Sequence, residues 1–155
     1  MAVVGPGEGA ATPEQLAEAE EVGRLLAAAG AIVVCGGLGG AMEAACRGAQ
    51  SAGGTALGIL PGRDRSDANS FVDVAITTGL GEARNALVVR AADALVAVGG
   101  GYGTLSEIAL ALKSGTPVVG LGTWDLARGG ETDAGIVRAE DPRDAAETAL
   151  GLARK

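Results

Sequence analysis

The sequence predicts an α/β fold: a Rossmann-like, doubly wound and mainly parallel sheet with helices on both faces, in a single domain over residues 1–155. Short, unbroken aliphatic runs such as AIVVC and DALVAVGG are typical of parallel strands buried on both faces. Segments of helical composition separate these runs, and strands alternating with helices form right-handed crossovers. A chain of 155 residues is long enough for one domain with a sizeable core.

The predicted strands follow the aliphatic runs in order. They lie at residues 1–4, 31–35, 55–60, 73–78, 94–98 and 117–121, with a weaker run at 134–137. Helices are expected at 13–29, 41–52, 82–92 and 104–113, and from 142 onward. Thr12 and Gln15 form the sequence signature of a capping box around Pro13. Asp141 and Pro142 give the last helix a similar start.

Charge and hydropathy limit the classes of partner. The net charge of −7, from 12 basic and 19 acidic residues, and the lack of a basic run predict that the protein does not bind nucleic acid. No apolar run has membrane-spanning length, and the first residues do not resemble a signal peptide. We therefore expect a cytoplasmic protein that makes no membrane contact.

Cysteine and histidine usage restricts the chemistry. Cys35 and Cys46 are too far apart for a CxxC motif, so both are expected to be buried, reduced thiols. The chain has no histidine, which excludes a Ser-His-Asp triad, a Cys-His pair and a His-ligated metal. The spacing of Asp64, Asp67 and Asp73 matches no EF-hand or two-metal pattern. We expect no metal site and no required cofactor.

Glycine-rich segments follow three of the predicted strands: GPGEG, GGLGG and GGGYG. The carboxyl ends of parallel strands meet at one edge of the sheet, where ligands of such folds bind. Glycines there let backbone N–H groups approach a phosphate at a helix N-terminus. Each segment alone could be only a tight turn, but three on one edge favour a shared site. The candidate phosphate-binding residues are Gly7, Gly36, Gly37, Gly39, Gly100, Gly101, Gly103 and Thr104.

Two common nucleotide motifs are absent or incomplete. No GK[ST] follows the glycines, so the chain has no Walker A loop. GPGEGA fits the loose G-x-G-x-x-[GA] pattern, but Cys35 ends the second strand where a dinucleotide-binding protein has an acidic residue. NAD is therefore disfavoured. The irregular stretch at residues 61–70 is either a lid or a surface loop.

Glu107 and Arg84 are the candidate catalytic residues if the protein is an enzyme. Glu107 follows the GGGYG glycines in the predicted helix and can face a ligand held by Thr104. The alternative is that Glu107, as an acidic residue near a helix start, only complements the helix dipole. Arg84 stands at the start of the preceding helix, where a cation is unfavourable unless an anionic ligand or a salt bridge compensates.

The segments GGLGGAME, EARN and GGGYGTLSE, in this order, resemble the LOG family, often mislabelled lysine decarboxylase, within the superfamily that includes the Smf/DprA Rossmann domain. The resemblance covers about residues 3–121. LOG enzymes carry PGGxGTxxE and an Arg-Lys pair, and they cleave the N-glycosidic bond of nucleoside 5′-monophosphates. Gly99 replaces the motif's proline and Asn85 replaces the lysine. Both departures resemble the short branch that includes molybdenum cofactor carrier proteins.

The resemblance leaves two hypotheses. In the first, the protein is a carrier that binds a nucleotide or a molybdenum cofactor type of ligand through its phosphate. In the second, it is a nucleoside 5′-monophosphate phosphoribohydrolase in which Glu107 polarises the ribose or water and Arg84 steadies the reacting region. Asn85 removes a charge that the family's enzymes carry, so we favour the carrier. Lysine decarboxylation is not expected. The resemblance also implies a homodimer or homotetramer.

Overall fold

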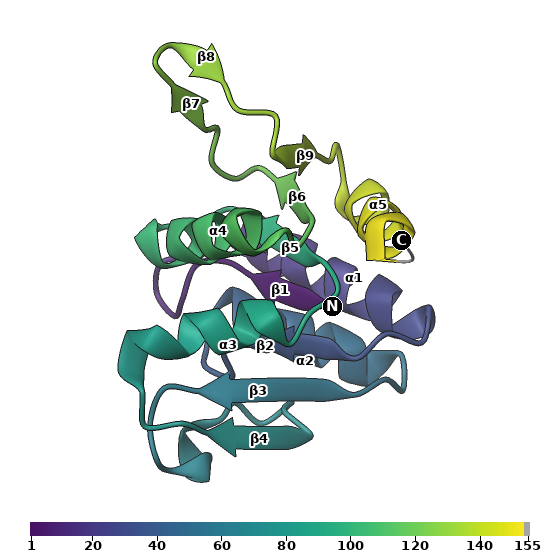
Figure 1. Cartoon of the computed structure of the whole chain (residues 1–155). Coiled ribbons are helices and arrows are strands. Elements are labelled where there is room, and N and C mark those ends of the chain that lie inside the picture. Colours follow the sequence, from purple (N-terminus) through teal and green to yellow (C-terminus); the bar gives the residue numbers. More distant parts are fainter. Residues whose placement is uncertain (154–155) are drawn as a thin grey trace.

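The computed structural model describes residues 1–153 and contains a seven-stranded sheet in the order β4-β3-β2-β1-β5-β6-β9, with every neighbouring pair parallel (Figure 1). Its strands are β1 (Ala2–Val4), β2 (Val33–Cys35), β3 (Ala56–Leu60), β4 (Val74–Thr77), β5 (Leu95–Val98), β6 (Val118–Leu121) and β9 (Ile136–Arg138). The helices are α1 (Pro13–Ala28), α2 (Ala41–Ser51), α3 (Asn85–Arg90), α4 (Tyr102–Ser114) and α5 (Pro142–Ala153).

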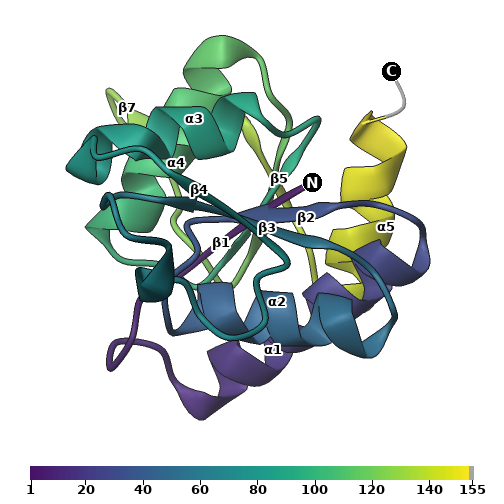
Figure 2. The same ribbon diagram turned by 90° about the horizontal axis from the view of Figure 1, so that it is seen from below.

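The helices cover both faces of the sheet. Figure 2 shows α1, α2 and α5 on one face and α3 and α4 on the other. Because side chains alternate along a strand, each central strand supplies both layers. In β1, Val3 packs under α1 and α2, while Ala2 and Val4 join the core under α3 and α4. The predicted fold class, a Rossmann-like α/β domain, is confirmed.

Helix starts follow the sequence signals. Thr12 Oγ1 accepts a hydrogen bond from the backbone N–H of Gln15, and the Gln15 side chain accepts one from the N–H of Thr12. This is the predicted capping box. At α5, Asp141 Oδ1 accepts from the N–H of Asp144, as expected for an N-cap.

Three segments differ from the sequence prediction. The helix expected at 82–92 is divided into a 3₁₀ turn, Gly81–Arg84, and the shorter α3. The strand expected at 134–137 lies slightly later, as β9. An antiparallel hairpin of β7 (Ala127–Arg128) and β8 (Glu131–Thr132) was not predicted; its strands have exposed side chains, so no hydrophobic pattern marks them. In Figure 1 it projects from the body of the domain.

The strand order creates a crevice at the carboxyl edge of the sheet. The chain runs outward from β1 through β2 and β3 to β4, then returns to place β5 on the other side of β1. Helix α1 leaves β1 toward one face, whereas α4 leaves β5 toward the opposite face. The point where a sheet reverses in this way is where α/β proteins bind ligands. No helix within residues 1–153 combines the length and apolarity needed to cross a bilayer.

Candidate functional site

Two adjoining cavities occupy this crevice. The first, which we call the glycine cavity, has a volume of about 290 Å³ and lies between the starts of α1 and α4, with Gly100 and Gly101 in its wall. The second, the Arg–Glu cavity, has a volume of about 450 Å³ and contains Arg84 and Glu107. The cavities share four lining residues: Gly5, Gly7, Gly103 and Thr104. They therefore form one cleft with two lobes.

Most of the candidate residues from the sequence meet in this cleft. Gly7, Gly103 and Thr104 line both lobes, Gly100 and Gly101 line the glycine cavity, and Gly36, Arg84 and Glu107 line the Arg–Glu cavity. Gly37 and Gly39 line neither lobe. Gly37 adopts a left-handed backbone (φ 78°) and faces Leu60, while Gly39 faces the side chain of Glu8.

Arg84 and Glu107 form a buried pair, each 7% exposed. Arg84 Nη1 lies 4.0 Å from Glu107 Oε1 and donates a hydrogen bond of 2.6 Å to Asn85 Oδ1. Arg84 Nε is buried and has no hydrogen-bond partner among the described residues. Asn85 in turn donates to Ser106 Oγ on α4, at 3.1 Å. The guanidinium is thus positioned by its neighbours and still has an unsatisfied donor, which is typical of a group that meets an anion or acceptor in a complex.

Burial raises the pKa of Glu107 to about 7, and the nearby positive charge of Arg84 opposes that rise. Burial also lowers the pKa of Arg84, although an arginine stays charged at neutral pH. Because α4 begins at Tyr102, Glu107 lies beyond its first turn, so complementing the helix dipole does not explain its position. A carboxyl that changes charge near neutrality, beside a fixed cation, is suited to ligand recognition or proton transfer.

The three glycine turns differ in how their helix N-termini are satisfied. The capping box of Thr12 and Gln15 closes the start of α1. At the start of α2 the N–H of Ala41 donates to the carbonyl of Pro6, at 2.9 Å, and Gly40 lies against the backbone of Gly7. Only α4, of these three helices, begins at the cleft with neither a side-chain cap nor a crossing carbonyl on its first turn.

Trp124 and the end of β6 hold the GGGYG turn. The indole Nε1 of Trp124 donates to the carbonyl of Gly101, at 3.1 Å, and its ring packs on Tyr102 with the centroids 5.6 Å apart. The N–H of Gly99 donates to the carbonyl of Leu121. Trp124 therefore packs over the start of α4.

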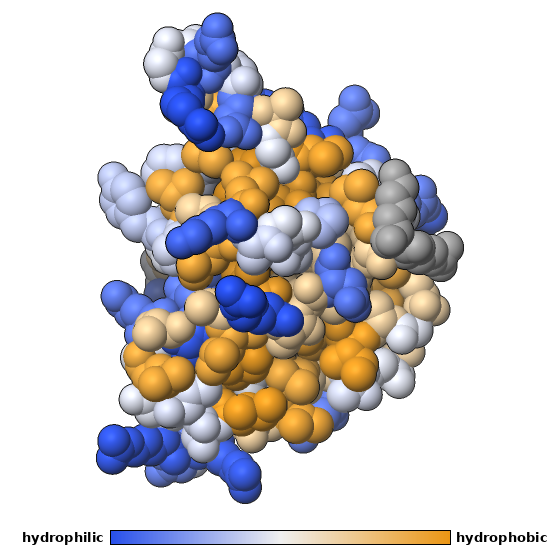
Figure 3. All heavy atoms as spheres, in the orientation of Figure 1, coloured by the Kyte–Doolittle hydropathy of each residue, from blue (hydrophilic) through white to orange (hydrophobic). Residues whose placement is uncertain are grey.

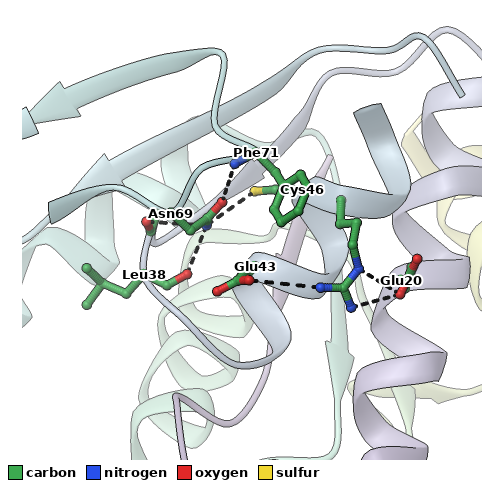
Figure 4. A network of polar contacts seen from close by, with 8 residues as sticks. Glu20, Leu38, Glu43, Cys46, Asn69 and Phe71 are labelled. Carbon is green, nitrogen blue, oxygen red and sulfur yellow. Dashed lines mark hydrogen bonds and ion pairs between the residues drawn. The ribbon is translucent and has the colours of Figure 1, made fainter. Parts of the chain in front are cut away.

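Asn69 ties the loop at residues 61–70 to the GGLGG turn (Figure 4). Its side-chain amide donates to the carbonyl of Leu38 at 2.9 Å and, more weakly, to that of Gly37 at 3.4 Å. Its backbone N–H donates to the same Gly37 carbonyl at 2.9 Å. Sequence reasoning did not identify Asn69, because its partners lie more than thirty residues away in the chain. This end of the loop is thus anchored to the GGLGG turn, whose Gly36 and Leu38 line the Arg–Glu cavity.

Acidic and sulfur side chains do not gather into a metal centre in the part of the chain that the structure describes. Within residues 1–153 no group of three or more His, Cys, Asp or Glu side chains could hold a metal ion. The site therefore consists of backbone donors at the start of α4 together with Thr104, Arg84, Asn85 and Glu107.

Comparison with known proteins places the chain in a family. Residues 1–146 match the SLOG cluster4 family. An uncharacterized protein of Archaeoglobus fulgidus is 48% identical over 121 residues, which are 78% of this chain and 78% of that protein. DNA processing protein A of Helicobacter pylori, which binds single-stranded DNA, shares the fold at 20% identity, with a TM-score of 0.68 over 97% of this chain and 80% of that one.

Two solved structures are more similar. The molybdenum cofactor binding protein of Rippkaea orientalis is 39% identical, with a TM-score of 0.87 over 97% of this chain and 94% of that one. The molybdenum cofactor carrier protein of Chlamydomonas reinhardtii is 38% identical, with a TM-score of 0.86 over 99% of this chain and 97% of that one. These matches confirm the resemblance inferred from the motifs, and the chain belongs to the SLOG cluster4 family.

Proposed function

We propose that the protein is a carrier that binds a phosphorylated ligand of the molybdenum cofactor type in the two-lobed cleft. The phosphate lies in the glycine cavity against the first turn of α4, near the Thr104 hydroxyl. The ring system of the ligand extends into the Arg–Glu cavity, where Arg84 and Glu107 contact its polar edge. The similarity to the two molybdenum cofactor proteins supports this ligand class.

The observation that carries the proposal is the uncapped start of α4 opening onto the same cleft as the buried Arg84. Free N–H groups and the helix dipole favour an anion at this position. Added Cβ atoms at Gly101 and Gly103 would meet nothing within 4 Å, so space is open beside the backbone. The unpartnered Arg84 Nε supplies a further donor. A ligand with a phosphate at one end and a polar ring at the other satisfies both features at once.

The substitution Gly101→Asp tests this proposal. Gly101 has φ −102°, which any residue adopts, so the variant is expected to fold. Its carboxylate lies among the phosphate-binding amides, and we expect at least about a tenfold loss of affinity, or roughly 1.4 kcal/mol. Affinity is measured by calorimetry with molybdenum cofactor and with AMP.

Gly151→Asp is the matched control, because Gly151 is exposed on α5 and an added Cβ there also meets nothing within 4 Å. Unchanged affinity in Gly101→Asp for every phosphorylated ligand that the native protein binds would contradict the phosphate site.

The second candidate function is cleavage of the N-glycosidic bond of a nucleoside 5′-monophosphate. The near-neutral pKa of Glu107 favours it, because a general acid or base works best when its pKa is close to the operating pH. Chromatography of AMP incubated with the protein detects released adenine. If adenine is released by the native protein and not by Glu107→Gln, the protein is an enzyme. If AMP binds and no adenine is released, the carrier function is supported.

A further inference from the structure

The fold brings together two cysteines that lie outside the proposed ligand contacts. Cys35 is the last residue of β2, and Cys46 lies on the second turn of α2. Both side chains are fully buried, and their sulfur atoms are 3.3 Å apart. Between them in the chain lies the GGLGG turn, whose Gly36 and Leu38 line the Arg–Glu cavity. The thiols therefore flank one wall of the ligand site.

Hydrogen bonds connect both sulfur atoms to this wall. The backbone N–H of Gly37 donates to Cys35 Sγ, at 3.3 Å. The amide of Asn69 approaches Cys46 Sγ at 3.8 Å while it donates to the carbonyl of Leu38 (Figure 4). A change at either sulfur atom therefore changes the contacts that position the GGLGG turn and the loop that covers it.

We propose that Cys35 and Cys46 form a redox-sensitive pair, closed to a disulfide by a peroxide, and that closure rearranges the GGLGG wall of the cleft. The two sulfur atoms are in direct but non-bonded contact at 3.3 Å, since a disulfide has an S–S length of about 2.04 Å. The pair also has unequal acidity: a hydrogen bond from Cys35 lowers the pKa of Cys46, while the same contact and burial raise that of Cys35. Cys46 is thus the better attacking thiolate.

Hydrogen peroxide supplies the oxidising equivalents. The Cys46 thiolate attacks one peroxide oxygen, the O–O bond breaks, and the departing hydroxide takes up the thiol's former proton to give water and a sulfenic acid. The Cys35 sulfur then attacks the sulfenic sulfur, and hydroxide leaves with the Cys35 proton as a second water. Two thiols lose two electrons in total, and one peroxide is reduced to two waters.

Closure requires the sulfur atoms to move together by more than about 1 Å. Because Cys35 directly precedes Gly36 and Gly37, this motion pulls on the turn. The new S–S bond also redirects the sulfur lone pairs that accept from Gly37 and Asn69, so these two contacts weaken. The effect on ligand affinity rests on the proposed function, whereas the disulfide itself does not.

Peptide mapping tests the bond without any ligand. Cleavage after glutamate separates Cys35 from Cys46, because Glu43 lies between them. After peroxide treatment of the native protein, we expect fragments 22–43 and 44–82 to stay linked until dithiothreitol is added.

Two controls remove one thiol each: Cys35→Ser and Cys46→Ser must show no linked fragments. Asn69→Ala, which frees the loop over Cys46, should link faster. If both thiols of the native protein stay reduced, or oxidise separately without linking, the proposal is wrong.

Amide exchange tests the coupling to the turn. In the oxidised protein, the Gly37 amide hydrogen should exchange at least about tenfold faster than in the reduced protein, and dithiothreitol should reverse the change. An unchanged rate in a fully linked sample overturns the coupling, whatever the ligand is. The affinity for AMP is then compared between the two states, and a difference that Cys46→Ser abolishes connects the disulfide to the proposed function.

Discussion

At the scale of single residues, burial decides how Glu107 behaves. The carboxyl is 7% exposed, and the cationic Arg84 beside it is 4.0 Å away and already engaged with Asn85. The attraction therefore offsets only part of the cost of removing the charge from water. Near neutral pH the site exchanges between a protonated carboxyl, which donates a hydrogen bond, and a carboxylate, which accepts one. A ligand can select either form.

This burial makes stability depend on pH. The pKa of Glu107 is raised from 4.5 to about 7 on folding, so the folded protein binds the proton more tightly than the unfolded chain. The stabilising contribution of Glu107 to the free energy of unfolding is fully present below pH 4.5. As the pH rises to about 7 this contribution is lost, which lowers the free energy of unfolding by up to about 3 kcal/mol. Urea titrations should therefore show that the free energy of unfolding of the native protein falls between pH 4.5 and about 7, relative to that of Glu107→Gln.

Glu131→Gln is the control for that measurement, because Glu131 is exposed on the β7–β8 hairpin. Its free energy of unfolding should follow that of the native protein at every pH. If Glu107→Gln does the same, the raised pKa is wrong.

At the scale of elements, small residues set the contact between α1 and α2. An added Cβ at Gly48 would lie 1.9 Å from the carbonyl oxygen of Glu20, and one at Gly23 would lie 2.1 Å from that of Ala45. The backbones of the two helices therefore touch directly at these glycines. This close approach fixes the position of α2, which carries Cys46 and begins at the GGLGG turn.

Gly48→Ala should separate these helices. The added methyl group cannot be accommodated without a backbone shift, and overpacking of this kind costs about 1–3 kcal/mol of unfolding free energy. Gly151→Ala places the same methyl group in open space on α5 and should be neutral or stabilising by up to about 1 kcal/mol. Urea unfolding of both variants measures the difference. Equal stabilities would mean that α1 and α2 do not pack at this distance.

At the scale of the whole molecule, one face of the sheet carries exposed apolar side chains. Val74 and Ile76 on the edge strand β4 are 46% and 44% exposed, and Leu80 and Leu87 nearby are 53% and 39% exposed. Figure 3 shows apolar surface over the region where Figure 1 places α3, β3 and β4. Exposed apolar patches and open edge strands are typical of surfaces that associate.

The expected homodimer or homotetramer is tested on this face. Ile76→Lys introduces a charge into it and should shift the molar mass, measured by light scattering, toward that of the monomer. Arg65→Glu, in the exposed 3₁₀ turn at residues 65–67, is the control for a change of charge alone. A native protein that is monomeric at all concentrations would contradict the expected oligomer.

The sequence by itself determined the α/β class, the positions of the main strands along the chain, the capping of α1 and α5 and the edge of the sheet that carries the candidate cleft. These features depend on local periodicity and turn chemistry, which neighbouring residues encode. The motif resemblance also indicated the family. The exposed β7–β8 hairpin could not be predicted, because its residues carry no hydrophobic alternation.

Only the tertiary structure decided how these parts meet. It left the start of α4 open while the capping box closed α1 and the Pro6 carbonyl met α2, a difference that glycine counts cannot show. It also buried Arg84 beside Glu107, placed Asn69 on the GGLGG turn, and brought Cys35 to 3.3 Å from Cys46. Such contacts join residues far apart in the chain. They depend on helix packing and strand order across the sheet, which local sequence does not record.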